Sequence, residues 1–127
     1  IQDHLFVGIF PALQEAGIAA LLDPKSEEAV AQLNAVYDSR RDAFVQVAAN
    51  IGWQAFPSRG SFYAWMPVPK GYTSESFADL LLEKAHVAVA PGKGFGPAGD
   101  AYVRIGLLES RSVWSKAVNR IADLAFI

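Results

Sequence analysis

The sequence predicts an α+β fold: a two-layer sandwich with helices on one face of a small mixed or antiparallel sheet, preceded by a long helix. Up to Gly52 the apolar residues repeat at helical spacing. Beyond Gly52, short apolar runs bounded by Gly and Pro alternate with two further helical patterns. The chain has 127 residues, of which 52% are hydrophobic and 19% charged, as is typical of a folded globular protein.

The first helix is expected over residues 12–22, directly after Pro11, because proline suits the first helical turn. Its apolar side chains point to several sides, so something else must bury them. The sequence does not begin with Met, and we expect a piece of a longer protein. An exposed apolar helix also favours association, and we expect the chain to form dimers.

The second helix is expected to start after the Asp23-Pro24 break, with Asp23 or Ser26 as its N-cap. Glu27 and Glu28 then stand in the first turn, where the helix dipole favours acids. Gly52 is expected to end this helix, because glycine is common just after the C-terminal end of a helix. A helix of this length either bridges two domains or lies across a sheet.

The segments after Gly52 are predicted from turn residues and periodicity. The strands are expected at residues 53–56, 61–68, 87–90 and 101–108. Thr73 or Ser74 caps a helix whose core face carries Phe77, Leu80, Leu81 and Ala85, and Ser110 caps a last helix with Val113, Trp114, Ala117, Val118, Ile121 and Leu124 on one face.

Composition excludes several classes of function. The net charge of -2 gives no support to a nucleic-acid partner, and the absence of cysteine excludes disulfides and thiolate zinc sites. His4 and His86 have no partner at ligand spacing, so no metal site is expected. The sequence has neither an apolar run of membrane-spanning length nor a signal-peptide pattern, and we expect a cytoplasmic protein with no membrane partner.

Residues 94–99 match G-x-G-x-x-G. A dinucleotide site requires a helix N-terminus after this motif, but residues 100–105 have the pattern of a strand. Pro97 also removes one amide from the supposed phosphate cradle. We therefore expect a flexible loop with left-handed turns.

Arg104 lies in the middle of the apolar strand at residues 101–108. Arginine keeps its charge and is rarely buried without an anionic partner. One interpretation is an ion pair at the strand end with Asp100 or Glu109. The other is binding of a ligand carboxylate, which the planar guanidinium receives in bidentate fashion.

Several segments, in order, resemble the class I and II aminotransferases of fold type I. Residues 37–42 resemble the family's Y-x-x-R-R-D, and residues 57–65 its P-x-x-G-[ST]-F-Y-x-W. Residues 91–96 resemble its P-G-x-x-F-G loop, and residues 102–107 the strand with its substrate-binding arginine. Residues 11–21 look like the last helix of its large domain. The resemblance covers nearly the whole chain.

The resemblance implies that Arg104 binds the α-carboxylate of an amino-acid or 2-oxo-acid substrate. It places Phe95 and Gly60 at the active-site mouth. It assigns residues 1–22 to the tail of the large domain, 23–52 to an interdomain helix and 53–127 to the small domain. The parent would be a homodimer that transfers an amino group between an amino acid and a 2-oxo acid.

The family's Schiff-base lysine, which precedes a Gly-x-Arg-x-Gly stretch, has no counterpart here. We therefore expect pyridoxal phosphate in the full-length parent, none bound covalently to this chain, no catalytic residue in it, and no activity of the chain alone. The alternative is a free-standing α+β module that binds or interacts without catalysis.

Residues 4–8, just before the first helix, contain no Arg or Lys. In the family this segment contributes to the side-chain pocket of the partner subunit. A carboxylate buried there without a cation would be costly, whereas an apolar side chain would gain from burial. We expect neutral or hydrophobic amino donors rather than aspartate. Two alternatives stay open: a protonated His4, or a cation supplied by the large domain, would pair with an acidic side chain.

Overall fold

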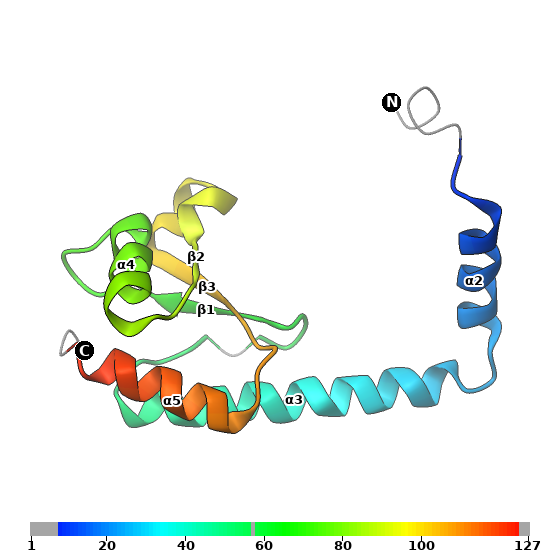
Figure 1. The fold of residues 1–127 in the computed structure, drawn as a ribbon, viewed down its shortest axis with the longest axis horizontal. Coiled ribbons are helices and arrows are strands. Elements are labelled where there is room, and N and C mark those ends of the chain that lie inside the picture. Colours follow the sequence, from blue (N-terminus) through cyan, green and yellow to red (C-terminus); the bar gives the residue numbers. More distant parts are fainter. Residues whose placement is uncertain (1–7, 57, 125–127) are drawn as a thin grey trace. The chain divides into compact units, whose positions relative to one another are not determined.

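The computed structural model describes residues 8–56 and 58–124 of the chain (Figure 1). The elements follow in the order α2 (Pro11–Leu22), α3 (Ser26–Asn50), β1 (Tyr63–Pro67), α4 (Ser74–Leu80), β2 (Ala90–Pro91), β3 (Tyr102–Gly106) and α5 (Arg111–Ala122). The chain divides into two compact units, Ile1–Ala35 and Val36–Ile127, with the boundary inside α3. The three expected domain segments remain predictions.

Both N-terminal helices form where periodicity and turn residues predict them. Pro11 is the first residue of α2, and this helix has no buried residue. In α3, Glu27 and Glu28 occupy the first turn. Gly52 adopts a φ of 78° and donates its N–H to Ala49 O at 3.0 Å, so it closes the end of α3 as predicted.

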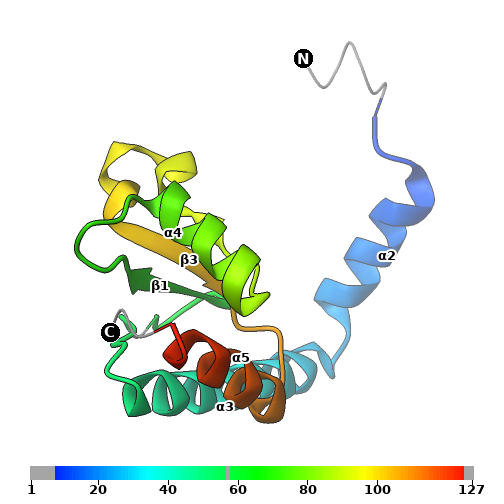
Figure 2. The same ribbon diagram turned by 60° about the vertical axis from the view of Figure 1, so that its left-hand side comes forward.

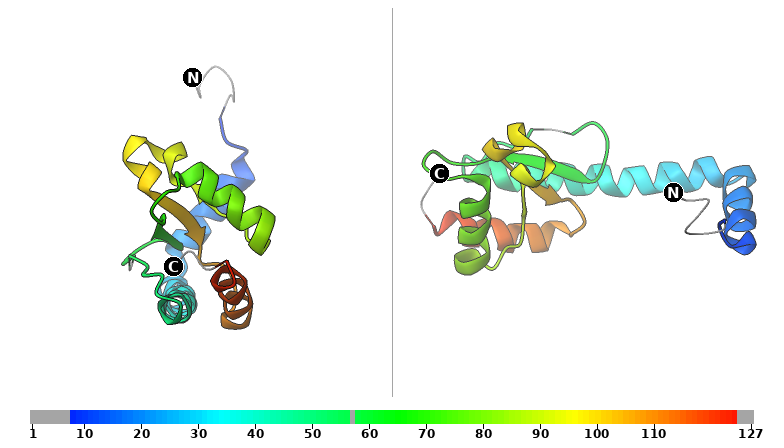
Figure 3. Two further views of the ribbon diagram at one scale, coloured as in Figure 1. Left: turned by 90° about the vertical axis from the view of Figure 1, so that its left-hand side faces the viewer. Right: turned by 90° about the horizontal axis from the view of Figure 1, so that it is seen from above.

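The sheet of Val36–Ile127 has the strand order β1-β3-β2, with both pairs antiparallel. Burial alternates along β1 and β3, as expected when one face of a sheet meets a core. The buried face carries Ala64, Met66, Val103 and Ile105. Figure 3 shows α4 and α5 on the same side of β3.

The helices of this unit share one core with the buried sheet face. α5 runs beside the C-terminal part of α3 (Figure 2), and the rings of Trp114 and Phe44 pack edge to face with centroids 4.7 Å apart. Phe77 of α4 is completely buried in the same core. The predicted two-layer α+β class is therefore confirmed.

The strand predictions at residues 53–56 and 87–90 were largely wrong. Within 53–56 only Phe56 forms a single bridge, to Trp65, and β2 contains only Ala90 and Pro91. The reason is that helix ends use the backbone amides first. Trp53 N–H donates to Ala48 O at 3.1 Å, and Val87 N–H donates to Leu81 O at 3.0 Å.

The helix caps follow the sequence in one case and depart from it in another. Thr73 caps α4 in a reciprocal capping box with Ser76, as predicted. Ser110 precedes α5, but its hydroxyl shares a hydrogen bond with Ser112 rather than capping the helix. Among the described residues, no helix is long and apolar enough to cross a membrane.

Candidate functional site

Arg104 lies at the centre of β3, on the sheet face that points away from the core. In the strand register it stands opposite Trp65 on β1 and Ala90 on β2. Its neighbours Val103 and Ile105 are buried, while Arg104 itself is half-buried. Strand alternation therefore presents a cation on an otherwise aromatic surface.

Two aromatic rings enclose the guanidinium of Arg104. Its Cζ lies 4.0 Å from the ring centroid of Tyr63 and 4.1 Å from that of Phe95. Both distances lie well within the range of favourable cation–π contact. Each ring therefore stabilises the cation by direct contact with the guanidinium.

Arg104 has no protein anion among the residues that the structure describes. Its Nε is buried and has no hydrogen-bond partner in the described part of the chain. Asp100, one of the two acids considered for a strand-end ion pair, instead accepts hydrogen bonds from the hydroxyl of Ser74 at 2.8 Å and from its N–H at 3.1 Å. An unpaired arginine with one buried, unsatisfied donor has the chemistry of an anion-binding group.

Residues 91–101 form the loop that carries Phe95. The loop contains two 3-10 turns, Gly92–Phe95 and Pro97–Ala101, and it leads into strand β3 rather than into an α-helix. A Cβ atom on Gly92 would collide with the carbonyl oxygens of Gly99 and Tyr102. The backbone of the loop therefore packs against itself. The loop is not the dinucleotide-binding loop that the G-x-G-x-x-G motif suggests.

The loop is tied to the start of α4 through Ser74, a fully buried residue. The Ser74 hydroxyl donates to Asp100 and accepts the N–H of Lys93 at 3.3 Å. Nζ of Lys93 lies 2.8 Å from a carboxylate oxygen of Glu75. These contacts fix both ends of the segment that places Phe95 against Arg104.

The hydrogen bonds from the hydroxyl and the N–H of Ser74 lower the pKa of the Asp100 carboxyl. A carboxyl whose pKa is lowered by folding stabilises the fold above its unfolded pKa, near ~4, and loses that contribution as the pH falls through the folded pKa. We expect Asp100→Asn to lower the free energy of unfolding at pH 7, with the difference from the wild type shrinking below about pH 4. Urea unfolding followed by circular dichroism over this pH range measures it. If Asp100→Asn lowered the free energy of unfolding equally at pH 7 and in acid, the stabilising role of the Asp100 charge would be contradicted.

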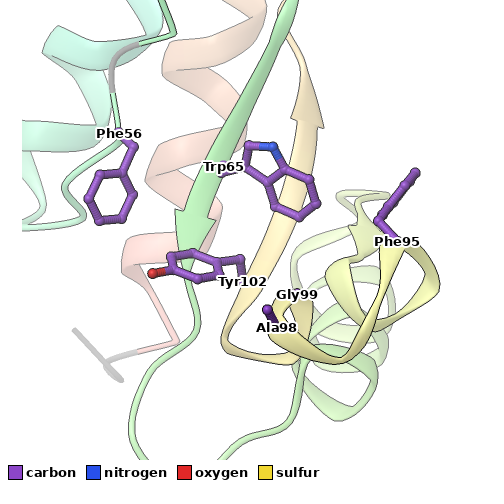
Figure 4. Close-up of a pocket in the computed structure, with 6 residues that line it drawn as sticks. All are labelled: Phe56, Trp65, Phe95, Ala98, Gly99 and Tyr102. Atoms are coloured by element: carbon purple, nitrogen blue, oxygen red, sulfur yellow. The ribbon is translucent and has the colours of Figure 1, made fainter.

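An open apolar hollow of about 410 Å³ lies beside Arg104. Phe95 forms one wall of the hollow and also contacts the guanidinium of Arg104. Figure 4 shows the lining residues, which include no charged side chain: Phe56, Trp65, Phe95, Ala98, Gly99 and Tyr102. The arrangement places the cation of Arg104 next to a surface suited to an apolar group.

The site residues expected from the sequence have different surroundings. Arg104 and Phe95 are in direct contact. Gly60 is exposed, does not line the hollow, and has no atom near enough to touch an added Cβ. Sequence reasoning missed Tyr63 and Trp65 as members of the site, although strand alternation places both on the face of Arg104.

The family model described as "Aminotransferase class I and II" matches residues 2–121. The chain belongs to the class I and II aminotransferases. L-glutamine–4-(methylsulfanyl)-2-oxobutanoate aminotransferase of Bacillus subtilis is 54% identical over 123 residues, which are 97% of this chain and 30% of that protein. LL-diaminopimelate aminotransferase of Moorella thermoacetica is 43% identical over 95% of this chain and 30% of that protein.

Solved structures show the same fold. Substrate-bound BacF of Bacillus subtilis is 39% identical with a TM-score of 0.87, over 97% of this chain and 31% of that protein. A mutant of the aspartate aminotransferase of Thermus thermophilus is 29% identical with a TM-score of 0.86, over 96% and 32%. This aminotransferase chain thus spans about 30% of the length of the curated relatives it matches.

Aminotransferases of this class imply pyridoxal phosphate, and the residues of this chain do not fit its covalent attachment. Lys93 pairs with Glu75. The remaining lysines, all exposed, are Lys25, Lys70, Lys84 and Lys116. None of the lysines lines the hollow beside Arg104.

Proposed function

We propose that this chain is the substrate-carboxylate-binding domain of an aminotransferase that moves an amino group between an amino acid and a 2-oxo acid. The observation that carries the proposal is the guanidinium of Arg104, held between Tyr63 and Phe95 with no protein anion among the described residues. Every α-amino acid and every 2-oxo acid carries a carboxylate on the reacting unit. One arginine can thus serve both half-reactions.

In this proposal the role of the chain is binding and orientation. Arg104, which the rings of Tyr63 and Phe95 contact, receives the carboxylate through its guanidinium N–H groups. Fixing that end of the substrate sets the direction of the bonds at the α-carbon, which lowers the entropic cost of reaction. Pyridoxal phosphate supplies the electron sink for amino transfer when it is bound in the parent, a protein that we expect to be a homodimer.

The 127-residue chain alone should not transfer amino groups, because none of its lysines lines the hollow. After incubation with pyridoxal phosphate and reduction with borohydride, mass spectrometry should find no lysine modified to stoichiometry. The parent protein under the same conditions should retain one modified lysine and transfer amino groups from amino acids to a 2-oxo acid. A parent without such transfer would contradict the proposed function.

We further propose that the parent prefers amino donors with neutral or hydrophobic side chains. The hollow beside Arg104 is lined by aromatic and small apolar residues, and a carboxylate side chain would lose hydration there without a compensating cation. A relative with 54% identity carries glutamine and a methylsulfanyl 2-oxo acid in its name. The segment at residues 4–8, including His4, lies outside the described residues.

A donor panel on the parent tests this preference. We expect kcat/KM for methionine, leucine or phenylalanine to exceed that for aspartate by about tenfold or more, since an uncompensated carboxylate costs at least ~1.4 kcal/mol. Trp65→Arg, which adds a cation to the lining, should narrow the gap, and Trp65→Phe serves as its control. A clear preference for aspartate in the wild type would show this interpretation to be wrong.

A further inference from the structure

Contacts with aromatic rings, rather than hydrogen bonds or ion pairs, hold the side chain of Arg104 in its orientation. Within residues 8–56 and 58–124, its Nε has no hydrogen-bond partner and no carboxylate pairs with it. What remains is the contact of its guanidinium with the rings of Tyr63 and Phe95. The direction in which Arg104 offers its edge to a ligand therefore depends on what holds these two rings.

Tyr63 is itself the end of a row of aromatic rings. The ring centroids of Phe62 and Tyr63 lie 4.6 Å apart. The ring of Tyr37 on α3 stacks on that of Phe62, with the centroids 5.6 Å apart and 28° between the ring planes. The guanidinium of Arg40 lies 5.8 Å from the ring of Tyr37. The row thus runs from α3 to Arg104 through contacts that each favour a defined geometry.

Both supports of the row are fixed in the fold. Tyr37 stands seven positions before Phe44, close to the same face of α3, and Phe44 is completely buried in the core. The carbonyl of Phe62 accepts the N–H of Leu107 at 2.7 Å, which holds Phe62 at the end of the β1–β3 pair. A row anchored in this way can transmit a constraint to Tyr63.

We propose that Tyr37 and Phe62 are positioning residues for the substrate-carboxylate site. Through Tyr63 they hold the guanidinium of Arg104 in the orientation that receives the carboxylate. This inference rests on the proposed function of Arg104. Neither Tyr37 nor Phe62 contacts the ligand; removing the ring at position 37 loosens Tyr63, and the edge of Arg104 loses its fixed direction.

The first test uses the 127-residue chain itself. Rings at 4.0 and 4.1 Å from Cζ should displace the δ and ε proton resonances of Arg104 upfield. Tyr37→Leu should reduce this displacement, whereas Tyr37→Phe, which keeps the ring, should preserve it. Tyr72→Leu is the matched control, because the Tyr72 ring packs against Phe77 with centroids 5.8 Å apart. An unchanged Arg104 signal in Tyr37→Leu, or an equal change in Tyr72→Leu, would overturn the proposal.

The second test uses the parent enzyme. Tyr37→Leu should raise KM by the same factor for every amino donor, up to about tenfold for a lost aromatic contact, with a smaller change in kcat. Tyr37→Phe should restore the wild-type KM. If Arg104→Ala raises KM and Tyr37→Leu does not, this inference fails alone. If Arg104→Ala has no effect either, the proposed function of Arg104 fails and this inference fails with it; the resonance measurement then shows only whether Tyr37 orients the Arg104 side chain.

Discussion

Arg104→Ala in the parent aminotransferase should lower kcat/KM by roughly a hundredfold for every amino donor, whatever its side chain. A bidentate, charge-assisted contact to a carboxylate contributes about 3 kcal/mol, and each 1.4 kcal/mol corresponds to about a factor of ten. The loss should be uniform because the carboxylate is common to all donors. A residue that selected the side chain would instead penalise one class of donor.

Two variants make this measurement specific. Arg104→Lys keeps the charge but offers no planar fork, so it should recover only part of the loss. Arg120→Ala removes an exposed arginine from the last turn of α5 and should leave kcat/KM unchanged. Near-normal efficiency of Arg104→Ala would mean that Arg104 only packs between Tyr63 and Phe95.

Gly92→Ala should lower the free energy of unfolding by on the order of 3 kcal/mol. An alanine Cβ at this position would overlap the carbonyl oxygens of Gly99 and Tyr102 and approach the ring of Trp65 to 2.9 Å. Backbone atoms cannot move aside as the end of a flexible side chain does. The whole loop must therefore shift, and Phe95 with it.

Gly94→Ala provides the matched control within the same loop, because an added Cβ there meets no atom within 4 Å. Urea unfolding of the chain, followed by circular dichroism, compares the two variants. Tryptophan fluorescence gives a second reading, since Trp65 contacts Phe95 edge to face at 5.6 Å. Equal stability of Gly92→Ala and Gly94→Ala would show that the loop does not depend on this close approach.

Helices were more predictable from this sequence than strands, for a local reason. The boundaries of α3 and α4 depend on nearby residues, such as Gly52 and the Thr73–Ser76 capping box. Strand pairing depends on distant segments, and the amides of Trp53 and Val87 are taken by the preceding helices. No local sequence pattern distinguishes a backbone amide that bonds to a helix end from one that bonds to a neighbouring strand.

In the candidate site, too, one part was predictable from the sequence and another part required the fold. Arg104 stands out because a charged residue interrupts an apolar strand. The rings that enclose it come from separate segments, with Tyr63 on β1 and Phe95 on the glycine-rich loop, so only the fold reveals the enclosure. The loop was expected to use left-handed turns, yet of its glycines only Gly96 has a positive φ, while Gly92 is required for close backbone approach.

The buried hydroxyl of Ser74 makes the start of α4 and the glycine-rich loop one exchangeable unit. It bonds to Asp100 and Lys93 near the two ends of the loop. A loop transplanted from a relative onto this scaffold would keep these contacts only if it brings groups that bond to this hydroxyl. Chimaeras that exchange residues 91–101 should therefore carry position 74 along with them, and substitutions at positions 74 and 100 should show strong epistasis.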